Sequence, residues 1–247
     1  MNSIVGHTSI IRQEYKYYIS FQTYLALKSQ LGNCMELDEN ANRTSSTYKV
    51  RSLYFDNIDQ NDFNEKVDGI YSREKFRIRS YDESLKVFKF ESKKRIDLAI
   101  KKTSETLDKK TVDSIISGNY EELLLKDSAL LRRAYGKLKG NGYKPRVIVE
   151  YDRLAYRLPY NNIRITLDLN LRTYNSCINL INPNIASTPV FKDNTQILEI
   201  KFSGFLPSHL RSLIGKFTSS RNSISKFVLC QQQISHGPWD DLIDKPF

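Results

Sequence analysis

The sequence has few of the residues that build disulfide frameworks and zinc sites. Its 247 residues include three cysteines, Cys34, Cys177 and Cys230, and three histidines, His7, His209 and His236. An odd number of widely spaced cysteines argues against a disulfide framework and against a zinc knuckle, and no HExxH motif occurs. We therefore expect the cysteines to be small, buried apolar residues.

Long apolar runs and nucleotide-binding loops are missing as well. No run approaches the ~18–20 residues that span a bilayer, and no small-residue cleavage site follows the first apolar stretch. GxGxxG and Walker motifs do not occur, and GKLKGNG at residues 136–142 has the spacing of a turn. We therefore expect a cytoplasmic protein that uses neither a Rossmann nor a P-loop site.

Positive charge is in excess. The chain has 38 Lys and Arg against 28 Asp and Glu, a formal net charge of +10, which favours an anionic partner. Its 40% hydrophobic and 27% charged residues are typical of a globular protein. No repeat, long linker or low-complexity tract divides the chain, so we expect one domain over residues 1–247.

Alternating patterns predict an α+β protein. Strand-like segments cover residues 12–19, 48–56, 72–81, 86–95, 98–107, 144–156, 163–168 and 196–203. Helical patterns cover residues 23–31, 111–117, 120–139, 208–217 and 225–233. Eight antiparallel strands suffice to close a β-barrel that holds one extended ligand, with helices packed outside.

Five of these strands have one apolar face and one charged face. With Lys102, the charged faces hold twelve basic residues, namely Arg12, Lys16, Arg73, Lys75, Arg77, Arg79, Lys89, Lys93, Arg95, Lys102, Arg164 and Lys201. They hold four acidic ones, Glu14, Glu91, Asp168 and Glu199. A face exposed to water usually mixes both signs, because like charges repel across paired strands. This imbalance indicates a polyanion as the ligand.

Several motifs in a fixed order point to a known family. They are RQEYKYYI (12–19), VRSLYFDN (50–57), EKVDGIYSREKFRIRSYD (65–82), FKFESKKR (88–95), VIVEYDRLAYR (147–157), IRITLDLNLR (163–172), ILEIKFSG (197–204) and SISKF (223–227). With them the chain resembles the catalytic domain of the vacuolar transporter chaperone, a polyphosphate polymerase. That family lies in the triphosphate tunnel metalloenzyme superfamily, with the CYTH-type triphosphatases.

The resemblance implies an antiparallel barrel around a tunnel whose basic side chains bind a row of phosphates beside Mn²⁺ or Mg²⁺. The proposed catalytic residues are Arg77, Arg79, Lys93, Lys102 (with Lys101 as the alternative) and Arg164. The family motifs add Lys16, Arg153, Ser225 and Lys226 as substrate-binding residues, although the strand of Arg153 needs a bulge to present it. The charged faces add Arg73, Lys75, Lys89, Arg95 and Lys201. Glu199 is the principal metal ligand, with Glu14 and Glu91 as further candidates.

The chain departs from the family pattern at three positions. Arg12 replaces the first Glu of the CYTH motif ExExK, so Glu14 remains alone there. Ser223 and Arg95 stand where the eukaryotic polymerases carry a basic residue and a histidine, respectively. We find no SPX-like module or membrane segment in the sequence, so coupled translocation of polyphosphate is not expected.

These features predict transfer of the γ-phosphoryl group of ATP to polyphosphate. A tunnel triphosphatase that hydrolyses tripolyphosphate or nucleoside triphosphates is the alternative, and a noncatalytic polyanion-binding module is the second alternative. Nucleic acid is not an expected partner, because Phe76, Phe88 and Phe90 lie opposite the basic faces, where they cannot stack on bases. A membrane-protein partner and the oligomeric state stay open.

Overall fold

A computed structural model describes residues 12–41, 46–81, 87–96, 99–174, 180, 182 and 186–235. Cys177, His7, His236 and the side chain of Arg12 lie outside this part. Contacts within the chain divide it into two compact units, each assembled from three segments. Unit 1 contains Met1–Tyr48, Arg153–Leu169 and Asp193–Ile224, and unit 2 contains Lys49–Asp152, Asn170–Lys192 and Ser225–Phe247.

The strands form one ten-stranded sheet, antiparallel in every register that the described residues define. The strand order is β1-β10-β8-β7-β3-β4-β5-β6, with β2 paired to β7 and β9 to β8. Their bounds are β1 Arg12–Ile19, β2 Glu36–Leu37, β3 Thr47–Asp56, β4 Arg73–Ser80, β5 Phe88–Ile96, β6 Ala99–Leu107, β7 Lys144–Leu158, β8 Ile163–Thr173, β9 Thr188–Pro189 and β10 Gln196–Ser203.

The predicted α+β class is confirmed, but the closed eight-stranded barrel is wrong. The order of strands has two ends, β1 and β6, and the described residues show no pairing between them. Strand alternation fixes which face a side chain takes, but closure depends on tilt and stagger, which alternation does not encode.

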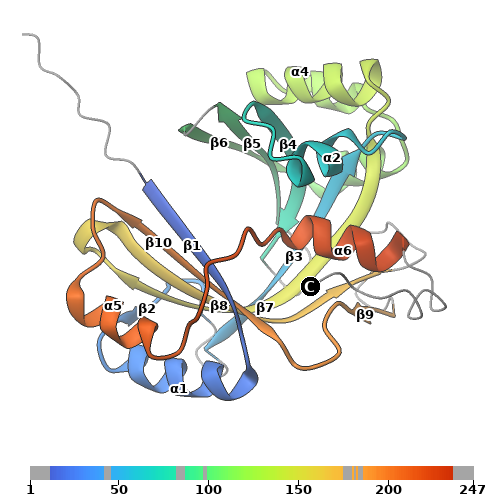
Figure 1. Cartoon of the computed structure of the whole chain (residues 1–247). Helices are drawn as coiled ribbons and strands as arrows, with labels where there is room; N and C mark the ends of the chain where they lie inside the picture. Colours follow the sequence, from blue (N-terminus) through green and yellow to red (C-terminus); the bar gives the residue numbers. More distant parts are fainter. Residues whose placement is uncertain are drawn as a thin grey trace, which may run out of the picture. The chain divides into compact units, whose positions relative to one another are not determined.

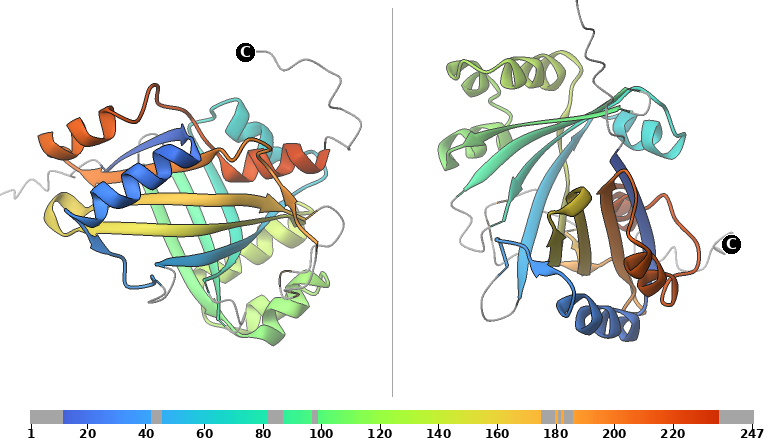
Figure 2. Two further views of the ribbon diagram at one scale, coloured as in Figure 1. Left: turned by 90° about the horizontal axis from the view of Figure 1, so that it is seen from below. Right: turned by 90° about the vertical axis from the view of Figure 1, so that its left-hand side faces the viewer.

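Unit 1 buries the apolar side of its strands beneath two helices, α1 (Phe21–Gly32) and α5 (Ser208–Gly215). Figure 1 and the right view of Figure 2 show both helices on one side of β1, β8 and β10. Leu27 and Leu31 of α1 share a fully buried cluster with Ile165 and Ile200 of the strands. Ser20 caps α1, because its side chain accepts a hydrogen bond from the Thr23 amide at 3.1 Å.

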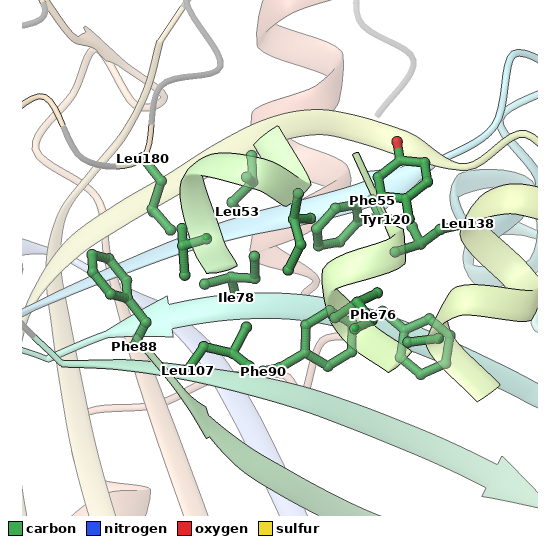
Figure 3. Packing of buried hydrophobic residues seen from close by; sticks show 14 of the residues in the cluster. Leu53, Phe55, Phe76, Ile78, Phe88, Phe90, Leu107, Tyr120, Leu138 and Leu180 are labelled. Carbon is green, nitrogen blue, oxygen red and sulfur yellow. The ribbon is translucent and has the colours of Figure 1, made fainter. Parts of the chain in front are cut away.

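Unit 2 has a second core, on the apolar side of β4, β5 and β6. Figure 3 shows Phe76, Ile78 and Phe90 of these strands packed with Leu53 of β3 and Leu138 from the helical layer. That layer contains α3 (Lys109–Ile116), the 3₁₀ turn η1 (Glu121–Leu125), α4 (Ala129–Tyr135) and η2 (Gly136–Gly140). The sheet therefore turns its other side, with the charged residues, away from this core.

The helix predicted over residues 120–139 is in fact η1, α4 and η2 in succession. The side chain of Ser128 accepts a hydrogen bond from the Leu131 amide at 3.5 Å and so starts a new helix. Helix α2 (Asn61–Val67) was not predicted at all. Its first turn is capped from β3, where the Asp56 carboxylate accepts hydrogen bonds from the amides of Asp62 and Phe63.

The remaining helix, α6 (Lys226–Ser235), belongs to unit 2, and the η3 turn (Tyr160–Asn162) to unit 1. Among the described residues, no helix is both long and apolar enough to cross a bilayer.

We expect Phe90→Ala to lower the free energy of unfolding by about 3–5 kcal/mol, because it leaves a cavity in the fully buried cluster of unit 2. Leu125→Ala is the matched control, since 76% of Leu125 is exposed and its loss should change stability by less than about 0.5 kcal/mol. Urea unfolding of both variants measures the difference. Equal effects would contradict this assignment of the core.

Candidate phosphate-binding site

The charged side of β4, β5 and β6 carries an unusual density of positive charge. We call it the basic face, and its charged members are Arg73, Lys75, Arg77 and Arg79 of β4, Lys89, Glu91, Lys93 and Arg95 of β5, and Lys102 of β6. Eight of these nine side chains are basic. The alternation of the sequence therefore leads, in the folded sheet, to one contiguous cationic surface.

Like charges face one another directly across this sheet. Lys75 lies opposite Lys93, which lies opposite Lys102, while Arg73 pairs with Arg95, and Arg79 with Lys89. This register places Lys102 on the basic face and Lys101, opposite Lys94, on the other side. Direct opposition of like charges destabilises a sheet, so an anion that bridges these rows would relieve it.

Lys75 is the most deeply perturbed lysine of the basic face, mainly because it is buried. Its amine donates a hydrogen bond to the Asp62 carbonyl at 2.5 Å and lies 4.4 Å from the centre of the Phe227 ring. Burial lowers the pKa of Lys75 to about 8, although the negative charge of Asp62 acts in the opposite direction. Burial, and then the charge of Arg95, likewise lower the pKa of Arg73. Arg73 donates to the Ile70 carbonyl.

Glu91 supplies the negative charge of the basic face. Its side chain is 2% exposed and contacts Arg77 Nη2 at 2.6 Å and Lys102 Nζ at 2.6 Å. Burial raises its pKa, but the charges of Arg77, Arg79 and Lys102 outweigh that effect and lower the pKa to about 2. Glu91 was predicted as a metal ligand, and here it is bound to two cations of the predicted catalytic set.

Hydroxyl groups accept hydrogen bonds from two of the three arginines of β4, Arg77 and Arg79. Arg77 Nη1 donates to the Tyr54 phenol oxygen at 2.8 Å, and Arg79 Nε donates to Ser52 Oγ at 2.8 Å. Tyr54 and Ser52 lie directly opposite these arginines on β3. Burial raises the pKa of Tyr54, but the charges of Arg77 and Arg79 lower it overall to about 8.

Ser225 and Lys226 lie at the start of α6 in the same unit. The Ser225 side chain accepts a hydrogen bond from the Val228 amide at 3.5 Å, and Lys226 Nζ lies 5.0 Å from the centre of the Tyr151 ring. Phe227 packs against Tyr54, with ring centres 5.1 Å apart. Through this aromatic contact α6 is attached to the strand that faces Arg77.

The remaining predicted residues lie in unit 1, on what we call the paired face, formed by Glu14, Lys16, Arg153, Arg164, Asp168, Glu199 and Lys201. Acidic and basic residues are mixed here. Lys16 lies opposite Glu199 and Glu14 opposite Lys201, although Lys201 also lies opposite the basic Arg164. Lys16 also donates to the Ile224 carbonyl at 3.0 Å. Much of the charge on this face is thus neutralised within the protein.

Two arginines of the paired face are held by carboxylates. Arg153 makes two hydrogen bonds to Asp168, at 2.6 and 2.7 Å, and its Nη2 lies 3.8 Å from Glu199. Arg164 contacts Asp38 at 2.9 Å and donates to the Tyr48 phenol at 3.0 Å. Burial raises the pKa of Asp38, but hydrogen bonds from Asn40 and the charge of Arg164 lower it overall.

Two carboxylates of the paired face lie near one ammonium group. Glu199 and Glu14 both approach Lys201 Nζ, at 2.6 and 3.7 Å. Mg²⁺ typically uses one or two protein carboxylates together with oxygens of the substrate and water. The described residues contain no group of three Asp, Glu, His or Cys side chains suited to a metal. Glu14 and Glu199 are thus the candidates.

Sequence reasoning missed the residues that hold the basic side chains. Tyr54 and Ser52 lie opposite Arg77 and Arg79 because of the strand register. Asp62 approaches Lys75 from another segment of the chain. No local pattern in the sequence reveals either relation. Asp62 is 1% exposed and accepts hydrogen bonds from Lys137 Nζ at 2.9 Å and Tyr143 Oη at 2.8 Å. The one available signal was Tyr54 itself, which alternates onto the same face as Ser52 within the motif VRSLYFDN.

A family model described as the VTC domain matches residues 11–234, which include both faces and all of α6 except Ser235. The chain belongs to the VTC domain family. This match confirms the resemblance drawn from the motifs. No curated protein matches this VTC domain.

Solved structures offer distant likenesses. A "putative adenylate cyclase" from Bacillus halodurans has 17% identity and a TM-score of 0.47, with 94% of each chain covered. The PH1819 protein from Pyrococcus horikoshii OT3 has 11% identity and a TM-score of 0.48, with 90% of this chain and 99% of that chain covered. At these TM-scores and identities, the two structures indicate nothing about the activity of this VTC domain.

We expect Glu91→Gln to lower the free energy of unfolding at pH 7 by on the order of 2–3 kcal/mol, because it leaves Arg77 and Lys102 without their anion. The folded pKa of about 2 lies below the unfolded value of about 4.3. The stabilisation is therefore complete above the unfolded pKa and is lost as the pH falls through the folded pKa. The difference in the free energy of unfolding between the wild type and the variant should therefore become smaller from pH 5 to about pH 3.

Urea unfolding at both pH values measures this gap. Glu121→Gln is the control, since its ion pair with Lys139 is solvent-exposed and its loss should matter little. A gap of the same size at pH 5 and pH 3 would show that Glu91 is not the titrating anion.

Proposed function

We propose that this VTC domain transfers the γ-phosphoryl group of ATP to the end of a polyphosphate chain. One observation carries the proposal, namely the rows of like-charged residues on the basic face, which a ligand with regularly repeated negative charges would neutralise. Polyphosphate and the triphosphate of ATP both have this character.

In the proposed reaction, the phosphates are bound by Arg77, Arg79, Lys93 and Lys102. The family resemblance assigns phosphate binding to Arg164 as well. A terminal oxygen of polyphosphate attacks the γ-phosphorus, a new P–O bond forms, and the bond to the bridging β–γ oxygen breaks. ADP leaves, and the chain gains one phosphate. Because the protein need not form a covalent bond, alignment and neutralisation of charge supply the catalysis.

The arginines and lysines differ in what they contribute. The planar guanidinium groups of Arg77 and Arg79 suit bidentate contacts to phosphate oxygens. Lys93 and Lys102 offer compact point charges without the fixed planar geometry of a guanidinium. We assign Arg73, Lys75, Lys89, Arg95, Lys16, Arg153, Lys201, Ser225 and Lys226 to binding of the substrate.

We assign Glu199 and Glu14 as ligands of Mn²⁺ or Mg²⁺. When bound, such an ion would neutralise phosphate oxygens and polarise the γ-phosphorus. Glu91 was the third candidate. Its two ion pairs favour a different role, in which it orients Arg77 and Lys102.

Incubation of the purified protein with ATP and Mn²⁺ should yield ADP and a long polymer that shifts the fluorescence of DAPI. Polymer length on a gel and ADP release are measured together, with EDTA as the control for the metal. Orthophosphate without polymer would replace this proposal with a triphosphatase. Binding of tripolyphosphate without any turnover would indicate a noncatalytic polyanion-binding module.

Arg77→Ala should reduce the turnover of ATP by about 100-fold or more, because it removes a preorganised donor to the reacting phosphates. Arg132→Ala is the matched control, since Arg132 is half exposed on α4 and pairs with the exposed Asp127. The control should keep wild-type turnover. Full activity of Arg77→Ala, in protein that melts cooperatively, would refute the assignment of the basic face.

A further inference from the structure

We propose that Tyr54 is a positioning residue that fixes Arg77 for phosphate binding and joins α6 to the basic face. Two contacts carry this inference, namely the hydrogen bond from Arg77 to the phenol oxygen and the packing of the Tyr54 ring on Phe227. It rests on the proposed function, since it concerns the same phosphate-binding residues, and no motif in the sequence assigned a role to this tyrosine.

The first contact completes the orientation of the Arg77 guanidinium. Glu91 contacts Nε at 2.7 Å and Nη2 at 2.6 Å, and Tyr54 accepts from Nη1 at 2.8 Å. A guanidinium has five N–H groups, so these contacts leave one on each terminal nitrogen. Two adjacent N–H groups match two oxygens of one phosphate. Without Tyr54, Glu91 alone would hold the group from one side.

The second contact concerns α6. The Phe227 ring lies 5.1 Å from the Tyr54 ring and 4.4 Å from the Lys75 amine. Lys226 and Ser225, both assigned to substrate binding, directly precede Phe227 in the chain. The ring of Tyr54 therefore supports α6, whereas its hydroxyl supports Arg77. A Tyr→Phe change separates the two functions, because it removes the hydroxyl and keeps the ring.

The hydroxyl also has a charge that depends on pH. The groups that face it are Arg77, Arg79 and Lys75 of β4 and Lys226 of α6. Burial raises the pKa of Tyr54, but Arg77 and Arg79 lower it overall to about 8. Above that pH a phenolate would compete with phosphate for Arg77 and add a negative charge to the site. Tyr54 should thus favour anion binding at neutral pH and oppose it at alkaline pH.

The test measures the dissociation constant of tripolyphosphate by calorimetry from pH 6.5 to pH 9.5, for wild type and Tyr54→Phe. At pH 6.5 the variant should bind about five- to tenfold more weakly, the loss expected for one hydrogen bond to a charged group. The dissociation constant of Tyr54→Phe divided by that of the wild type should fall as the pH rises. Above about pH 8 the variant should bind more tightly than the wild type, since only the wild type forms a phenolate.

Lys75 titrates in the same range, with a pKa of about 8, so the comparison is repeated in a Lys75→Met background. The same fall in the ratio should persist there. Tyr120→Phe is the matched control, since the Tyr120 phenol donates to the Tyr143 carbonyl in the core of the same unit. It should leave the affinity unchanged at every pH.

The outcomes separate this inference from the proposed function. A wild-type protein that does not bind tripolyphosphate would overturn the proposed function itself. If the wild type binds tripolyphosphate tightly and Tyr54→Phe binds it with the same affinity at pH 6.5, the role of Tyr54 is overturned but the proposed function is not. If Tyr54→Phe binds tripolyphosphate more weakly but the ratio of its dissociation constant to that of the wild type does not change with pH, the phenolate effect is refuted. Phe227→Leu tests the second contact, since it should weaken binding without changing the pH dependence.

Discussion

The register that places Lys75, Lys93 and Lys102 opposite one another is the constraint on which the basic face of unit 2 depends. These three lysines face one another across β4, β5 and β6, where a folded sheet would ordinarily place opposite charges. The sheet tolerates this arrangement because its other side is anchored in a large apolar cluster. Phe76, Phe90 and their neighbours stabilise the sheet, so its charged side need not supply that stability.

The surrounding polar groups restrain the basic residues without neutralising them. Glu91 lies between Arg77 and Lys102, Ser52 holds Arg79, and the Asp62 carbonyl holds the Lys75 amine. On the face itself one carboxylate, Glu91, accompanies eight basic side chains, and the nearby charges of Asp62 and Glu65 offset part of the excess at Lys75 and Arg73. A preorganised excess of this kind is what phosphoryl transfer requires, since little reorganisation then opposes the binding of phosphates.

The paired face of unit 1 follows a different principle. Its acidic and basic residues lie opposite one another, as Lys16 and Glu199 do, and Arg153 is bound to Asp168. The sequence predicted both faces by the same alternation and treated them as one charged lining. Only the register shows that one is largely self-neutralised and the other is not. The unbalanced positive charge therefore lies mainly on the basic face.

The sequence alone determined the eight longer strands, their apolar and charged sides, and the family, because side-chain direction in a strand alternates with a period of two and motifs are local; it did not predict the two-residue strands β2 and β9. It could not determine closure of the sheet, the helix α2 that Asp56 caps from β3, or the break at Ser128. The tertiary structure also decided the partner of each charge. Glu91 with Arg77 and Lys102, Asp38 with Arg164, and Tyr54 with Arg77 all depend on strand register or on segments far apart in the chain. Such contacts set the charge and the pKa values of the site, and no local pattern encodes them.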